Sequence, residues 1–75
     1  MSAAPLNFSP VGQEVKIMSC NVNPELRKHL ETLGILPGEK ITLLNSRAGD
    51  LIVRVRDSRL ALNQGLASKI LVSYA

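Results

Sequence analysis

His29 and Cys20 are the side chains best suited to metal ligation or nucleophilic chemistry, and each is the only residue of its type in this 75-residue chain. A metal site needs several converging His, Cys, Asp or Glu ligands. Nucleophilic catalysis needs a base and an orienting partner beside the nucleophile. No local motif supplies either arrangement. We therefore expect no metal site, no cofactor and no enzymatic activity. Cys20 is then an inert thiol or an incidental oxidation site. His29 is a partly exposed or core-edge residue, a contact residue or a pH-sensitive group.

Two further kinds of binding site are not expected from the sequence. A phosphate-binding P-loop places its glycines before a helix, whereas Gly34 and Gly38 follow a helical pattern. A groove for proline-rich peptides is built from aromatic side chains, and this chain has no Trp, one Phe and one Tyr.

Positive charge is the remaining chemical signal. The net charge is +3 and the pI about 9.5. In the rest of the sequence, neighbouring opposite charges cancel, as in Glu39 beside Lys40. The excess positive charge therefore lies in one predicted hairpin and at Lys69. The hairpin arginines are Arg47, Arg54, Arg56 and Arg59. Such a hairpin could face an acidic protein surface, a phosphate or only water.

A helix over residues 24–33 separates this hairpin from the start of the chain. Asn23 is placed to cap it, and Pro24 suits the first helical position. The apolar stripe of the helix consists of Leu26, Leu30 and Leu33. Its opposite face carries Arg27, Lys28, Glu31 and Thr32.

The exit from this helix is marked by glycine and proline. Gly34 follows the last periodic leucine, where a left-handed residue ends helices. Pro37 and Gly38 fit the central positions of a type II turn. The chain is therefore predicted to reverse from the helix into a strand.

Alternating apolar residues predict five strands, at about residues 13–18, 39–46, 51–56, 59–62 and 69–74, with a loop at 19–22 and a single helical turn within 63–68. With Asp57-Ser58 as a two-residue turn, Arg56 would face Arg59, and Val53 would face Leu62.

Residues 1–10 are predicted to form an extended N-terminal segment, the lead-in. Its first residues are expected to be loose, and its Leu6 or Phe8 is expected to lie against the barrel. The predicted fold class is mainly β: one domain over residues 1–75, a small SH3-like, five-stranded, partly open barrel with one α-helix inserted after the first strand.

Three segments in this order resemble the FeoA family of small partners of bacterial ferrous iron transporters. They are the helix with its exit (Leu26 to Gly38), Arg56-Asp57-Ser58-Arg59-Leu60-Ala61-Leu62, and Leu66-Ala67-Ser68-Lys69-Ile70-Leu71-Val72. The similarity runs from about Gly12 to Ser73. One departure is Ser46-Arg47-Ala48-Gly49-Asp50-Leu51, where relatives often carry a proline-rich loop, so a contact attributed to this loop does not carry over.

The resemblance implies a regulatory binding protein that contacts a large membrane-embedded, FeoB-type ferrous iron transporter with a cytosolic GTPase domain. Cytoplasmic location fits, because we find no signal peptide or membrane-spanning run. Two alternatives are a nucleic-acid-binding small barrel, which the missing aromatic residues disfavour, and a stand-alone relative of the C-terminal SH3-like domain of iron-dependent repressors. The candidate partner-binding residues are Arg27, Lys28, Leu30 and Glu31 on the helix and Arg54, Arg56 and Arg59 on the hairpin.

Overall fold

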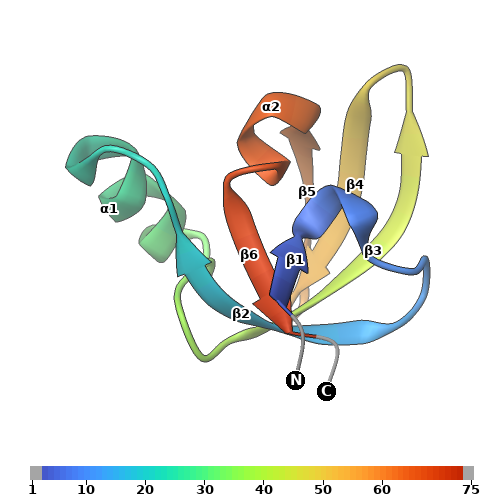
Figure 1. The fold of residues 1–75 in the computed structure, drawn as a ribbon, viewed down its shortest axis with the longest axis horizontal. Coiled ribbons are helices and arrows are strands. Elements are labelled where there is room, and N and C mark those ends of the chain that lie inside the picture. Colours follow the sequence, from blue (N-terminus) through green and yellow to red (C-terminus); the bar gives the residue numbers. More distant parts are fainter. Residues whose placement is uncertain (1–2, 74–75) are drawn as a thin grey trace.

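The computed structural model describes residues 3–73 and contains one curved, six-stranded antiparallel sheet (Figure 1). The strands are β1 (Ala3–Pro5), β2 (Glu14–Cys20), β3 (Lys40–Arg47), β4 (Asp50–Val55), β5 (Ser58–Asn63) and β6 (Ile70–Ser73), in the sheet order β1-β6-β2-β3-β4-β5. The helices are the 3-10 helix η1 (Leu6–Phe8), α1 (Pro24–Thr32) and α2 (Gln64–Ala67). The prediction of a mainly β, partly open barrel with a helix between its early strands is confirmed. Within residues 3–73, no helix is long and apolar enough to cross a membrane.

The sheet has six strands rather than five because the lead-in supplies one of them. Ala3 pairs with Ser73 and Pro5 with Leu71, so β1 extends the sheet beside β6. Of the two lead-in candidates for the core, Leu6 is fully buried, whereas Phe8 is 69% exposed. The prediction of loose first residues concerns in part Met1 and Ser2, which lie outside the described residues.

Helix α1 begins and ends where the sequence predicts. The Asn23 Oδ1 atom accepts a hydrogen bond from the Leu26 N–H at 2.8 Å. At the other end, the Gly34 N–H donates to the Glu31 carbonyl at 3.0 Å, and the Ile35 N–H donates to the Leu30 carbonyl at 2.9 Å. This pair of bonds is a Schellman motif, and the Gly34 φ of +94° is its left-handed residue.

The predicted turn after the helix is also confirmed. Gly38 has a φ of +95°, and the Glu39 N–H donates to the Leu36 carbonyl at 3.1 Å. The Gly38 N–H then donates to the Ile17 carbonyl at 2.8 Å, which joins the turn to β2. The helix exit is thus fixed to the sheet by backbone hydrogen bonds.

The leucine stripe of α1 is buried unequally. Leu30 is 1% exposed and belongs to the hydrophobic core together with Ile35. Leu26 and Leu33 are only partly buried. In Figure 1, α1 stands to one side of the curved sheet. Leu30 anchors the helix in the core, and Leu26 packs against the core from the first turn.

Two β-bulges account for irregular alternation along the strands. The register shifts between Leu43 and Asn45 in β3, which explains the adjacent leucines there. A second shift between Ile17 and Ser19 lets β2 continue to Cys20. The prediction that Ser19 and Cys20 form a loop was wrong, and Cys20 is buried at the end of a strand.

The hairpin register differs from the prediction by two residues. Its turn is Arg56-Asp57, so Arg54 rather than Arg56 faces Arg59, and Val53 faces Leu60. An even shift keeps each side chain on its predicted face, and Val53 is indeed buried. In this register Arg56, with a φ of +58°, lies in the turn and pairs with Glu39, and the bond from the Gln64 N–H to the Gly49 carbonyl continues the ladder beyond Asp50 and Asn63.

Replacing Gly34 and Gly38 by alanine separates backbone strain from close packing. Both glycines have positive φ, so each variant should lose about 1 to 2 kcal/mol of unfolding free energy. A Cβ at Gly34 would also lie 3.0 Å from Val55 Cγ1, whereas Gly38 has open space. Chemical denaturation should therefore show a larger loss for Gly34→Ala than for Gly38→Ala. Equal losses would mean that the helix exit does not pack closely on β4.

Alanine substitutions at Leu30 and Leu33 test how the helix is seated. Leu30→Ala should cost about 2 to 5 kcal/mol because it leaves a cavity in the core. Leu33→Ala should cost clearly less, because that side chain is only partly buried. Denaturant midpoints with unchanged m-values measure the difference. A larger effect at Leu33 would contradict the burial of the stripe.

Candidate functional site

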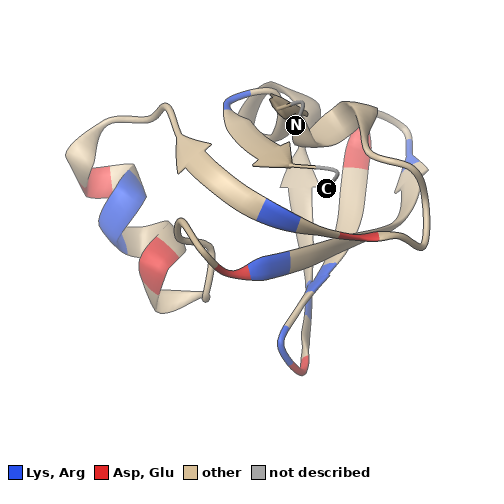
Figure 2. Cartoon of the chain, turned by 60° about the horizontal axis from the view of Figure 1, so that its bottom comes forward, with Lys and Arg blue, Asp and Glu red and all other residues tan. Residues whose placement is uncertain are grey.

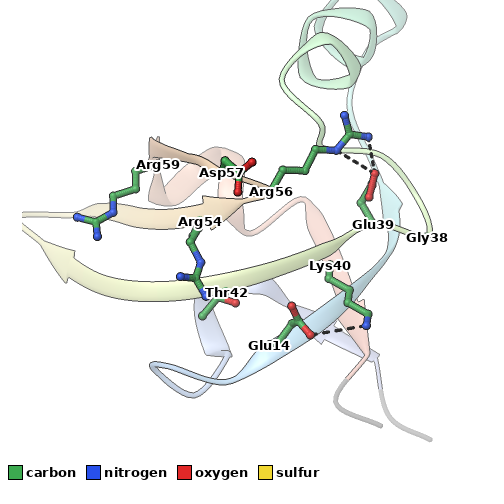
Figure 3. Close-up of a pocket in the computed structure, with 9 residues that line it drawn as sticks. All are labelled: Glu14, Gly38, Glu39, Lys40, Thr42, Arg54, Arg56, Asp57 and Arg59. Atoms are coloured by element: carbon green, nitrogen blue, oxygen red, sulfur yellow. Dashed lines mark hydrogen bonds and ion pairs between the residues drawn. The ribbon is translucent and has the colours of Figure 1, made fainter.

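An open groove of about 580 Å³ lies on the sheet and is lined mostly by polar and charged side chains (Figure 3). Its lining residues are Glu14, Gly38, Glu39, Lys40, Thr42, Arg54, Arg56, Asp57 and Arg59. We refer to these residues as the charged groove. All three predicted hairpin residues, Arg54, Arg56 and Arg59, are among them.

One cross-strand row runs through the groove. Glu14 on β2 pairs with Thr42 on β3, Thr42 with Arg54 on β4, and Arg54 with Arg59 on β5. Residues paired in this way have Cβ atoms about 5 Å apart on the same face of a sheet. The strand register therefore gathers one residue from each of four strands on the same face of the sheet.

Two ion pairs neutralise one side of the charged groove. The Arg56 guanidinium donates to Glu39 Oε1 from Nε at 3.2 Å and from Nη2 at 2.5 Å. Lys40 Nζ lies 3.7 Å from Glu14 Oε1. Figure 2 shows basic and acidic residues alternating along this part of the sheet. The sequence suggested that Glu39 and Lys40 neutralise each other, but each instead pairs with a residue from another segment.

Arg54 and Arg59 keep their positive charge exposed. Neither forms an ion pair within the described part of the chain, and both are exposed. They are direct cross-strand neighbours, and like charges in this position repel each other. Of the charged groove residues, Arg54, Arg59 and Asp57 lie outside the two ion pairs, so the two arginines leave a net positive charge there.

The predicted helix residues lie apart from this groove. Arg27 and Glu31 line a second hollow of about 340 Å³ between α1 and β2, together with Ser19, Cys20, Ile35 and Pro37. Arg27 Nη2 donates to the carbonyl oxygens of Cys20 at 3.4 Å and Val22 at 3.5 Å. Lys28 is exposed and lines neither hollow. Leu30 is buried and cannot contact a partner without unfolding, so it is no longer a candidate contact residue.

Arg56 connects the two regions. A Cβ at Gly34 would lie 3.6 Å from both Cδ and Nε of Arg56, so the arginine stem runs along the helix exit. Its guanidinium then reaches Glu39 in the groove. The helix end and the basic hairpin are therefore neighbouring parts of the surface.

Cys20 lies buried at the end of β2, and His29 lies on α1. Burial raises the pKa of the Cys20 thiol above its ordinary value, an effect that the nearby positive charge of Arg27 partly opposes. The thiol is therefore protonated at neutral pH and weakly nucleophilic. His29 is exposed on α1. Among residues 3–73, no three His, Cys, Asp or Glu side chains gather closely enough to hold a metal ion.

Six lining residues of the groove were not among the predicted contact residues: Glu14, Gly38, Glu39, Lys40, Thr42 and Asp57. The alternation of β2 and β3 indicated which of their residues face outward. It contained no signal for the pairing of Glu14 with Thr42 or of Thr42 with Arg54, because that depends on how separate strands align.

Comparison with known proteins places this fold in a family. The model of the FeoA domain matches residues 4–74. A Methanocaldococcus jannaschii protein named Fe(2+) transport protein A is 31% identical over 71 residues, which cover 95% of this chain and 87% of the relative. The crystal structure of an iron uptake regulatory protein (FeoA) superposes with a TM-score of 0.86 at 27% identity, covering 97% of both chains. Stenotrophomonas maltophilia FeoA, described as a procaryotic SH3 domain protein and solved with zinc, has a TM-score of 0.78 at 23% identity, covering 92% of this chain and 88% of that one.

The donor set of this chain predicts that the isolated protein does not bind ferrous iron tightly. An anaerobic titration of the apo protein with Fe²⁺ should show no stoichiometric site of sub-micromolar affinity, because no described cluster supplies several ligands. Any weak association should be unchanged in a variant with both Cys20→Ser and His29→Gln. A stoichiometric, tight site that this variant loses would contradict the prediction.

Proposed function

The chain belongs to the FeoA family, and from this premise we propose that it is a cytoplasmic regulatory binding protein of a ferrous iron transporter. Its partner is a membrane-embedded, FeoB-type permease with a cytosolic GTPase domain. The protein acts by protein–protein contact and catalyses no reaction of its own.

One observation carries this proposal: the similarity to FeoA proteins extends over nearly the whole described fold. The family model spans residues 4–74, and a solved FeoA structure covers 97% of the chain. The relatives are named for iron transport and iron uptake. A binding role also agrees with the described side chains, which form charged surfaces and contain no cluster suited to metal chemistry.

The proposed contact surface has two neighbouring parts. The first is the exposed side of α1 with Arg27, Lys28 and Glu31, and the second is the charged groove with Arg54, Arg56 and Arg59. Arg56 joins them, because its stem lies against the helix exit and its head lies in the groove. A partner that covers the helix end would therefore also reach the basic hairpin.

Co-purification tests the proposal. The immobilised protein should retain the ferrous iron transporter from detergent-solubilised membranes, with the retained protein identified by mass spectrometry. The triple reversal Arg54→Glu, Arg56→Glu and Arg59→Glu should reduce retention at least about tenfold, because it reverses the charge of one part of the contact surface. The helix swap Lys28→Glu with Glu31→Lys, which keeps the net charge, should also weaken retention.

A control for charge reversal elsewhere is the double reversal Arg47→Glu and Lys69→Glu, which is matched in net charge to the double reversal Arg54→Glu and Arg59→Glu; Arg47 and Lys69 are exposed and lie outside the contact surface. Circular dichroism should show that all variants fold. Failure of the wild-type protein to retain the transporter, or retention by every folded variant, would refute the proposed role or the proposed surface respectively.

A further inference from the structure

We propose that the charged groove binds an acidic, extended segment of the partner protein, with one of its carboxylates held between Arg54 and Arg59. The inference deepens the proposed function by naming the chemistry that this surface recognises. It can be tested on the isolated protein, without the transporter.

The arrangement of charges is the first argument. The charged groove has four basic and three acidic lining residues, and two of each are already paired with one another. Arg54 and Arg59 are left facing each other across adjacent strands. A carboxylate placed between them would accept hydrogen bonds from both guanidinium groups, and it would replace their mutual repulsion with attraction.

The remaining positions of the row favour a peptide over a small molecule. Small-molecule sites are usually concave and mostly apolar, whereas this groove is open and lined by polar side chains (Figure 3). Thr42, next to Arg54 in the row, is largely buried and forms part of the floor. At the far end of the row, Glu14 is paired with Lys40. An extended chain crossing the row would meet free positive charge at one end only.

The acidic residues of the groove argue against a nucleic acid. Glu14, Glu39 and Asp57 lie along it, and they would repel a continuous phosphate backbone. Nucleic-acid grooves also stack bases on aromatic side chains, and none lines this groove. Carboxylates spaced along a peptide can meet the two arginines and avoid the three acidic residues.

The test is an NMR titration of the ¹⁵N-labelled protein with a synthetic peptide of alternating Glu and Gly residues, at low and at physiological salt. The amide signals of Thr42, Arg54 and Arg59 should shift and saturate. The double variant Arg54→Gln and Arg59→Gln should bind at least about tenfold more weakly, because it loses charge-assisted hydrogen bonds. The double variant Arg47→Gln and Lys69→Gln, which has the same net charge, should bind nearly as well as the wild-type protein.

Three results would overturn the inference. Equal weakening in both double variants would mean diffuse attraction to net charge. Inorganic phosphate that shifts the same signals with equal or higher affinity would identify a small-anion site, and single-stranded DNA that binds more tightly than the peptide would identify a nucleic-acid groove. If the peptide binds as expected but the transporter is not retained, the groove chemistry stands and the proposed transporter role fails. If the transporter is retained but the peptide does not bind to these residues, only the inference about the groove is refuted.

Discussion

The close approach of the helix exit to the hairpin is the constraint on which both candidate surfaces depend. Gly34 has a φ of +94°, and a side chain there would press against Val55. Glycine in this position lets the Schellman hydrogen bonds bring Ile35 into the core beside Leu30 without backbone strain. The next turn then joins β2 through Gly38. The backbone that seats α1 therefore also places Glu39 where Arg56 reaches it.

Local signals in the sequence predicted most of the fold, because each depends on a few neighbouring residues. Asn23 and Gly34 mark the ends of α1, and Gly38 marks the turn before β3. The lead-in strand β1 was missed because its pairing with β6 joins the two ends of the chain and leaves no local pattern. The continuation of β2 to Cys20 was missed because a bulge interrupts its alternation.

The hairpin of β4 and β5 shows that alternating apolar residues specify the buried face of a strand but not its pairing register. The alternation of Leu51, Val53 and Val55 predicts which face is buried, and all three are buried. The same alternation is satisfied by registers that differ by two residues, so it cannot choose between them. In the observed register Arg56 lies in the turn and pairs with Glu39, a residue outside the hairpin. The sequence contains no signal for this pairing, because it depends on how separate segments align.

This difference in register decides where the free charge lies. In the predicted register, Arg56 faces Arg59 and contributes to an unneutralised patch. In the structure, Arg56 occupies the turn and is paired with Glu39, while Arg54 moves opposite Arg59. Adjacency in the sequence suggested that Glu39 and Lys40 cancel, yet strand pairing assigns them to Arg56 and Glu14. One side of the groove is therefore neutral, and the other carries Arg54 and Arg59 with only Asp57 as an unpaired acidic neighbour. Because the net attraction acts on that side alone, a bound acidic segment would be anchored there and not along the whole groove.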